Sequence, residues 1–390
     1  MKKNFTISLI ALMMSVVFYN VNAQQIAQIE QFEIESKFFD FPRTILVYTP
    51  SYYEEYTEAE YDVVYVFDAQ TRSLYDMVHA LLHGGDVQDS DENWRDYIVV
   101  GVSSPYIEET GYDRSNDFLP IRITPEDDGN QLSNGNSANF KRFIKEELNS
   151  WIADNYRTTG HSLAIGHSLG ASFILDAMIT DELFDDYIAI SPNLCWDNYR
   201  FADSFMQYDF YKENSPHFIY ITMGDEPISW SEFLPQWGTA WERVKEHTDA
   251  LMAPEIITVR TAEFPDYEHN KVILPALLHT LREYYQFRSI PVKSENNMSY
   301  PVEITLSGEN LTGEVYITGN QNALGNWNPA TIKMQKINDT TWSIRLNLTL
   351  PAEFKFTNGS WETQITTKNG GNGNLRIISP HRTNKHYMAY

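Results

Sequence analysis

One short segment places a serine where it could act as a nucleophile: Gly166-His167-Ser168-Leu169-Gly170. Glycines two positions before and two positions after the serine permit a sharp turn between a strand and a helix. Such a turn holds the hydroxyl up in a strained backbone geometry, and the helix start beneath it favours developing negative charge. An apolar run precedes Gly166 and a helical pattern begins at Leu169. We therefore expect Ser168 to be a nucleophile, with an incidental turn as the alternative.

A serine nucleophile needs a general base, which follows it in the chain when the serine lies on a strand-to-helix turn. Four histidines follow Ser168 before residue 288: His217, His247, His269 and His279. His217 leads into an expected strand, and His247 and His279 lie inside helical patterns. His269 lies between the last expected strand and the last expected helix, where a loop can carry the imidazole over the sheet edge. We expect His269 to be the base.

The carboxylate that orients the base should follow the preceding strand, which we expect at 218–223. Asp225 and Glu226 both meet this condition, and both could accept a hydrogen bond from the imidazole Nδ1. We prefer Glu226 because its longer side chain reaches further; Asp225 remains the alternative and Glu232 a more distant one. In another interpretation these carboxylates cap the next helix, and serine and histidine act as a dyad.

When a serine attacks a carbonyl group, an oxyanion hole with two backbone N–H groups directed at the tetrahedral oxygen is needed as well. The residue after the nucleophile, Leu169, supplies one of them. The loop after the third expected strand, Phe67-Asp68-Ala69-Gln70, should supply the other through Gln70.

The segments around these residues alternate between strand-like and helical patterns from residue 31 to about 288. The expected strands cover 31–35, 44–49, 62–68, 97–103, 162–166, 187–191, 218–223 and 256–261. The expected helices cover 74–82, 138–155, 169–179, 232–251 and 272–287. This alternation predicts an α/β fold with a mostly parallel sheet and helices on both faces. The long loop from Ser104 to Asn136 is typical of lids and binding walls.

The N-terminal segment has the pattern of a secretory signal peptide. Lys2 and Lys3 precede an apolar run from Ile7 to Phe18, and Val21-Asn22-Ala23 provides small residues for cleavage after Ala23. The run is short for a membrane span, although an uncleaved anchor is the alternative. We expect residues 1–23 to be removed and the mature chain, which has no second span, to be secreted or periplasmic.

The C-terminal quarter of the chain has a different sequence pattern. Residues 289–301 are polar and are expected to form a linker after the α/β domain at 24–288. Beyond them, segments at 302–306, 314–318, 341–346 and 353–356 alternate between apolar and polar residues, with Gly and Asn between. This pattern predicts a small antiparallel β-sandwich over 302–390.

Composition argues against several kinds of partner and site. The 390 residues include 53 acidic and 29 basic ones, a formal net charge of −24, which disfavours nucleic acid and anionic membrane surfaces as partners. The single cysteine, Cys195, cannot form an intramolecular disulfide. His79 and His83 are four residues apart but have no further ligand nearby in the sequence, so we expect no metal. The oligomeric state is left open.

Together, these residues resemble the putative-esterase branch of the α/β-hydrolases, which includes family-one carbohydrate esterases and siderophore esterases. The likeness extends from about Asp40 to Phe287. Its markers are the elbow at 166–170, His269, the segments 64–69, 99–102 and 189–192, and Arg114 with Asp117 and Pro120. The family commonly has Asp-Gly where this chain has Asp68-Ala69. The resemblance implies an α/β-hydrolase fold, ester hydrolysis or acyl transfer without a cofactor, and a substrate-binding role for Arg114.

The C-terminal module resembles a starch- or glycogen-binding module, on the segments 315–320, 324–327 and 353–356. In that family two tryptophans and a lysine form a glucan platform, and Trp327, Lys355 and Trp361 fall on those positions. Flat indole rings can stack on the apolar faces of sugars. Alternatively the tryptophans fill the core of the sandwich, as we expect for Trp342.

The leading hypothesis is therefore an exported serine esterase that acts on acyl groups carried by a polysaccharide or glycoside. A ferric-siderophore esterase is the second hypothesis; it predicts a basic patch, for which the loop 104–136 offers only Arg114 and Arg122. A third, from another class, is a glycan-binding protein with an inactive hydrolase scaffold. Hydrolase and acyltransferase differ only in the acceptor that reaches the acyl-enzyme, and the sequence does not separate them.

Overall fold

The computed structural model describes the chain from residue 28 onward with several gaps. The described residues are 28–50, 53, 60–83, 96–124, 135–213, 215–232, 234–254, 256–289, 299–349, 352–367, 374–377 and 384–389. The predicted signal peptide at 1–23 lies outside them, as do residues 125–134 of the long loop and 290–298 of the predicted linker.

Eight strands form one sheet in the larger domain, in the order β1-β2-β4-β3-β5-β6-β7-β8. Strands β3 to β8 run parallel, whereas β1 and β2 are antiparallel at one edge. The strands are β1 (Gln28–Ile34), β2 (Arg43–Thr49), β3 (Tyr61–Phe67), β4 (Tyr97–Val102), β5 (Thr158–His167), β6 (Asp186–Ile190), β7 (His217–Met223) and β8 (Ile257–Glu263). Each of the eight expected strands corresponds to one of them, and the predicted mostly parallel sheet is confirmed.

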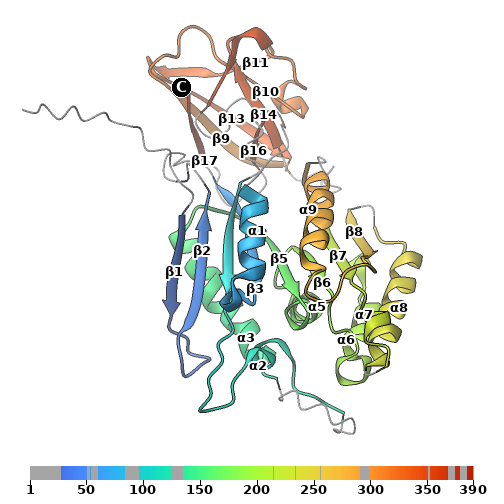
Figure 1. The fold of residues 1–390 in the computed structure, drawn as a ribbon. Helices are drawn as coiled ribbons and strands as arrows, with labels where there is room; N and C mark the ends of the chain where they lie inside the picture. Colours follow the sequence, from blue (N-terminus) through green and yellow to red (C-terminus); the bar gives the residue numbers. More distant parts are fainter. Residues whose placement is uncertain are drawn as a thin grey trace, which may run out of the picture.

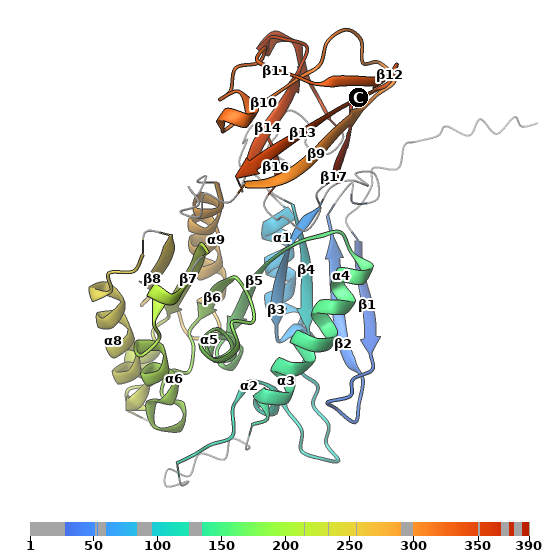
Figure 2. The same cartoon turned by 180° about the vertical axis from the view of Figure 1, so that it is seen from behind.

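Helices cover both faces of this sheet, because its central strands are apolar on both sides. All seven residues of β3 and all five of β6 are buried. Figure 1 shows α1 (Ser73–His83) and α9 (Ile273–Ser289) on one face. Figure 2 shows the other face, which is covered by α3 (Ser137–Phe143), η3 (Ile144–Leu148), α4 (Asn149–Asn155), α5 (Leu169–Asp181), α6 (Trp196–Met206) and α8 (Pro235–Ala250). Each face has its own apolar core.

Several elements were not predicted from the sequence. Near the carboxyl ends of the strands these are η1 (Ala69–Thr71), α2 (Arg114–Phe118), α7 (Glu226–Ser229) and the whole of α6; η4 (Phe210–Lys212) lies just before β7, at the amino ends. The α2 turn lies inside the long loop and is anchored by a buried ion pair between Arg43 of β2 and Asp117, at 2.6 Å. A capping box between Asp113 and Asn116 starts this turn.

The C-terminal domain is a two-sheet sandwich with a core of its own. One sheet has the order β11-β10-β14-β15, with β16 also paired to β14, and the other has the order β12-β13-β9-β17. The strands are β9 (Ser299–Ser307), β10 (Tyr316–Gly319), β11 (Ile332–Lys333), β12 (Gln335–Asn338), β13 (Thr341–Thr349), β14 (Ala352–Thr357), β15 (Gln364–Ile365), β16 (Leu375–Ile377) and β17 (Asn384–Met388); the 3-10 turns are η5 (Asn322–Leu324) and η6 (Trp361–Thr363). The predicted β-sandwich is confirmed, except that strand β17 pairs with β9 in parallel and not in antiparallel fashion. Trp342 is 2% exposed and fills the core, as expected.

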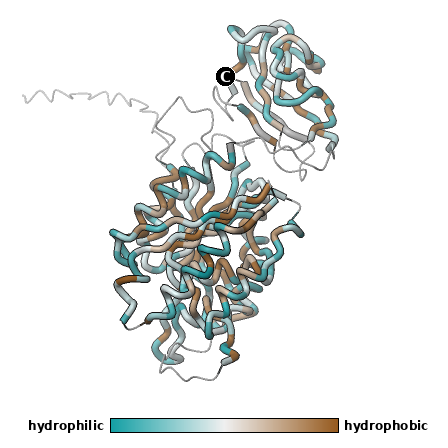
Figure 3. The backbone as a smooth tube through the Cα atoms, turned by 90° about the vertical axis from the view of Figure 1, so that its right-hand side faces the viewer, coloured by the Kyte–Doolittle hydropathy of each residue, from teal (hydrophilic) through white to brown (hydrophobic). Residues whose placement is uncertain are grey.

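Hydropathy follows this architecture. In Figure 3 the hydrophobic, brown segments run through the middle of the larger domain, whereas hydrophilic segments dominate its periphery. Within the described part of the chain, no helix has the length and apolar character needed to span a membrane.

Candidate active site

Ser168 occupies a tight turn between β5 and α5. Its backbone has φ 58° and ψ −122°, a strained conformation for a residue other than glycine. The flanking glycines explain how the turn closes, because a Cβ on Gly166 would lie 2.5 Å from the backbone of Gly170. The Ser168 N–H donates to the Ile190 carbonyl at 2.9 Å, which fixes the turn against β6. The predicted elbow therefore has the expected local geometry.

The structure brings His269 and Glu226 together. The distance from His269 Nδ1 to Glu226 Oε1 is 2.5 Å, and the Glu226 side chain is 0% exposed. Burial alone would raise the pKa of Glu226, but the hydrogen bond with His269 and the nearby Ser191 hydroxyl hold it below its ordinary value. An ionised carboxylate can only accept, so Nδ1 carries the hydrogen and Nε2 is left free to accept a proton.

A glycine makes this close approach possible. A Cβ on Gly224 would lie 2.7 Å from the Tyr267 carbonyl oxygen and 2.8 Å from Glu226 Oε2. The Asp225 N–H donates to the same carbonyl at 2.9 Å, which ties the loop of the acid to the loop of the base.

The two alternative acids lie elsewhere. Asp225 precedes α7, and its Oδ1 accepts from the Ser229 hydroxyl at 3.0 Å. Glu232 is exposed on the surface beyond α7. Among the three candidate acids, all of them described residues, Glu226 is the one that contacts His269.

Aromatic rings surround the His269 imidazole. Ring centroids of Trp230 and His167 each lie 4.6 Å from it, and that of Trp237 lies 5.7 Å from it. Sequence patterns did not indicate these neighbours, although His167 is adjacent to Ser168 in the chain. Among the described contacts no hydrogen bond joins Ser168 to His269; such bonds are often long before substrate binds.

The predicted oxyanion donors lie on the two expected loops. Leu169 is the first residue of α5, and Gln70 lies in η1 directly after β3. Among the described residues, no backbone acceptor for either N–H is seen in the loops and turns. The left-handed conformation falls on Asp68, with φ 64°, and Ala69 avoids it. Replacement of the family's glycine by Ala69 therefore causes no strain at that position.

Arg114, the expected substrate-binding residue, is engaged by a carboxylate. Its Nε and Nη2 donate to the two oxygens of Asp68 at 2.7 and 2.6 Å. The Gln70 side chain donates to Asp68 as well, at 3.0 Å, and accepts from the Ser104 N–H at 2.9 Å. The Arg114 side chain is 34% exposed. Arg114 therefore holds the Asp68 carboxylate beside the elbow. That Arg114 contacts the substrate stays a prediction.

The three predicted sugar-binding residues differ in their surroundings. Trp361, in η6, is 42% exposed, so its indole is open to solvent. Trp327 is half-buried and has a positive φ of 62°. Lys355 lies on β14, where its Nζ is 3.4 Å from Gln364 Oε1.

The two histidines of α1 have structural neighbours. The His79 ring stacks on Tyr48 with centroids 5.2 Å apart, and its Nε2 lies 3.3 Å from Asp76. Over the described residues, no group of three His, Cys, Asp or Glu side chains is arranged to hold a metal ion.

Known structures share this fold at low sequence identity. An IroE-like serine hydrolase from Shewanella oneidensis has a TM-score of 0.55 and 22% identity, over 66% of this chain and 80% of that one. The siderophore hydrolase EstA from Aspergillus nidulans has a TM-score of 0.53 and 20% identity, over 73% and 99%. The BES protein from Bacillus cereus has a TM-score of 0.53 and 21% identity, over 74% and 100%. A search of curated protein sequences gives no match.

Family models cover both domains. The model described as "Starch binding domain" matches residues 300–386, which contain almost the whole β-sandwich. The model described as "Putative esterase" matches residues 36–266, more than half of the chain, including the elbow and Glu226. The chain therefore belongs to the "Putative esterase" family of α/β-hydrolases and carries a C-terminal starch-binding domain.

Proposed function

We propose that this protein is an exported serine esterase that removes acyl groups from a polysaccharide or glycoside. The observation that carries the proposal is the 2.5 Å contact between His269 Nδ1 and the fully buried Glu226. The ring of His167, which directly precedes Ser168 on the strained elbow, lies 4.6 Å from that of His269. Buried acid, imidazole and elbow serine together are the parts of a Ser-His-acid triad.

The reaction proceeds through an acyl-enzyme. His269 Nε2 takes the proton of the Ser168 hydroxyl as Oγ attacks the ester carbonyl. Glu226 holds the imidazole in the required tautomer and stabilises the imidazolium. The N–H groups of Leu169 and Gln70 bind the oxyanion, and His269 then protonates the leaving alcohol. Water, activated by the same imidazole, releases the acid.

The starch-binding domain supports a glycan-borne substrate. A binding module tethered to a catalytic domain raises the effective concentration of substrate at the active site without adding contacts there. Trp361 is the exposed aromatic that we propose as a sugar-stacking platform, with Trp327 and Lys355 as further contacts.

Hydrolysis of 4-nitrophenyl acetate tests the esterase mechanism. At pH ~8, where an ordinary histidine is neutral, Ser168→Ala should reduce kcat by several orders of magnitude. The fold of the variant is checked by its circular dichroism spectrum. Equal turnover by the two proteins would remove Ser168 from the mechanism and favour a glycan-binding protein with an inactive scaffold.

Acetate release from acetylated starch tests the role of the second domain. Trp361→Ala should raise KM for this polymer and leave turnover of 4-nitrophenyl acetate unchanged. Ile337→Ala is the matched control, because Ile337 is also an exposed apolar residue of the same domain, on β12. If the two variants behave alike on the polymer, Trp361 does not bind the glycan.

Ferric-siderophore hydrolysis is the second candidate function. It would require a basic surface for a strongly anionic complex, whereas Arg114 is paired with Asp68, and Arg200 lies 3.4 Å from Asp197. Arg122 stacks on Trp196, with its guanidinium 4.3 Å from the ring. These contacts favour the glycan hypothesis. Comparing kcat/KM on a ferric tris-catecholate ester and on acetylated starch separates the two functions.

Export is a separate part of the proposal. N-terminal sequencing of the protein recovered from outside the cytoplasm should begin at Gln24, directly after Ala23. A mature protein that retains Met1 or Lys2 would contradict cleavage.

A further inference from the structure

His167 precedes the proposed nucleophile in sequence, yet its side chain contacts the residue proposed as the base. His167 Nε2 lies 2.8 Å from the main-chain carbonyl oxygen of His269. A carbonyl oxygen can only accept a hydrogen bond, so Nε2 of His167 is the protonated nitrogen of that ring. The two rings are 4.6 Å apart between centroids.

This bond ties the base loop to the strand that carries the nucleophile. Other contacts attach the same loop to the β7 side of the site: Phe264 N–H donates to Met223 O at 2.8 Å, and Asp225 N–H donates to Tyr267 O at 2.9 Å. The His167 bond reaches β5 instead, directly before Ser168. It therefore fixes the distance between the two reacting side chains, to which catalytic rates are very sensitive.

The charge state of His167 suits this position. Burial, and secondarily the neighbouring His269, lower the pKa of His167 to about 4, so the ring is neutral near pH 7. A cation here would oppose the imidazolium that His269 becomes when it takes the serine proton. A neutral donor holds the base without this repulsion.

We propose that His167 is a positioning residue of the esterase, which fixes the main chain of His269 relative to Ser168 through its Nε2–H donor. The inference rests on the proposed function, since it assigns His167 a role in the action of Ser168 and His269. It does not depend on which acyl group or glycan is the substrate.

A nearly isosteric pair of variants tests the donor directly. His167→Met removes the hydrogen-bond donor, whereas His167→Gln keeps a neutral N–H at a similar reach. For 4-nitrophenyl acetate, His167→Met should lower kcat by about two- to tenfold, the range expected for one ordinary hydrogen bond, with KM nearly unchanged. His167→Gln should recover most of that loss. A residue with only a structural role would instead lower the melting temperature and leave kcat per folded molecule the same.

Three results separate the inference from the function on which it rests. If Ser168→Ala abolishes turnover but His167→Met has wild-type kcat, the inference is wrong and the esterase function stands. Equal losses in His167→Met and His167→Gln also overturn it, because the donor would then be irrelevant. If Ser168→Ala retains full turnover, the proposed function itself fails. Should His167→Met not fold, His167→Phe, which keeps a ring without the donor, takes its place with the same expectations.

Discussion

The two histidines of β5 lie six residues apart and have opposite charge properties. At the amino end of the strand, His161 Nε2 is 2.7 Å from Asp186, and Asp185 is also near. Burial and Arg288 alone would lower the pKa of His161, but the two carboxylates outweigh them and raise it. At the carboxyl end, burial and His269 lower the pKa of His167 to about 4. One strand thus stabilises a charged imidazole at one end and a neutral imidazole at the other.

The amino end is a network in which each charge has partners. The fully buried Asp186 accepts hydrogen bonds from His161, from the Tyr284 hydroxyl at 2.9 Å and from the Phe218 N–H at 2.8 Å. Close by, Arg288 of α9 pairs with Asp62 of β3 at 2.8 Å. These contacts join β3, β5, β6, β7 and α9, which is the arrangement expected of a structural site.

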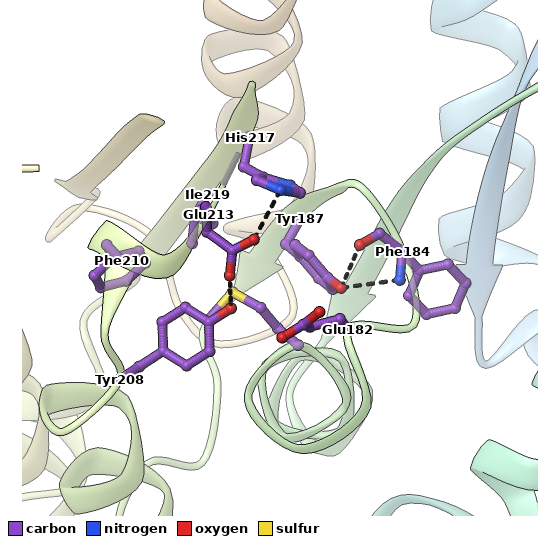
Figure 4. A pocket seen from close by; sticks show the side chains of 9 residues that line it. Glu182, Phe184, Tyr187, Tyr208, Phe210, Glu213, His217 and Ile219 are labelled. Atoms are coloured by element: carbon purple, nitrogen blue, oxygen red, sulfur yellow. Dashed lines mark hydrogen bonds and ion pairs between the residues drawn. The ribbon is translucent and has the colours of Figure 1, made fainter. Parts of the chain in front are cut away.

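The pocket drawn in Figure 4 also belongs to the amino-terminal edge of the sheet, because it is lined at the starts of β6 and β7. Its acids are already paired within the protein. Glu213 accepts from the Tyr208 hydroxyl and lies 3.2 Å from His217 Nε2, and Glu182 pairs with Lys212 at 2.6 Å. The pocket lies at the opposite edge of the sheet from the proposed catalytic site.

The carboxyl end differs in its backbone. Asp68, Ser168 and Ser191, which follow β3, β5 and β6, all have positive φ, as do Asp197 to Tyr199 in α6. Each such residue costs of the order of 1–3 kcal/mol and persists only where the surrounding structure enforces it. The comparison teaches that this sheet places a buried network of ion pairs at one edge and strained backbone geometry, beside the proposed catalytic residues, at the other.

The largest effect should come from substituting Glu226, the buried acid at the carboxyl ends of the strands. Glu226→Gln should lower kcat by roughly 10³–10⁴-fold, because the amide disfavours the required imidazole tautomer. Asp225→Asn is the matched control, since it changes the adjacent carboxylate, which contacts Ser229, and should leave kcat within a few fold. Steady-state kinetics on 4-nitrophenyl acetate measure both. The reverse ranking would assign the triad acid to Asp225 and contradict the structure.

Substituting Asp186, the buried acid at the amino ends of the strands, should lower stability and leave activity intact. Asp186→Asn removes the partner of a buried imidazolium, and such changes cost about 3–5 kcal/mol in the free energy of unfolding. Denaturant unfolding near pH 6, where His161 is charged, measures the loss. Activity per folded molecule should stay at the wild-type level, because the site lies at the other end of β5. A drop in kcat without loss of stability would mean that the two ends are coupled.

Sequence patterns predicted those features of the two sheet edges that follow a repeating pattern or a fixed spacing along the chain. The eight strands were recognisable as apolar runs, and Ser168 and His269 by their place after strands. The choice between Asp225 and Glu226 was open, because a single turn of α7 decides it: Asp225 lies before the turn and Glu226 points inward from its first residue. Helix α6 was not predicted, although its buried Phe201, Ala202 and Phe205 follow a helical spacing; the left-handed backbone of its first turn, at Asp197–Tyr199, has no signature in the sequence pattern.

Low pH should lower the free energy of unfolding because the buried His167 stays neutral in the folded protein. Its pKa falls from about 6.5 in the unfolded chain to about 4 in the folded protein, so the unfolded state binds the extra proton first. Stability should therefore be lost as the pH falls from about 6.5 to about 4, by about 3 kcal/mol from this group. His167→Gln cannot bind that proton and should lose correspondingly less. Comparing unfolding free energies of the two proteins at pH 7 and pH 4.5 cancels the shared carboxylate titrations; parallel curves would contradict a neutral His167.

The smallest expected effect has the opposite sign and comes from His161. Because its pKa is raised in the folded protein, its contribution is fully present below about pH 6.5, the ordinary value of an unfolded histidine, and is lost as the pH rises through the raised value. His161→Gln keeps a hydrogen-bond donor for Asp186 but carries no charge, so its unfolding free energy should decline less above pH 6.5. The wild type and the variant are compared by denaturant unfolding at pH 6 and pH 8.5. If both decline equally, His161 is not charged at the amino end, and the contrast between the two ends of β5 is lost.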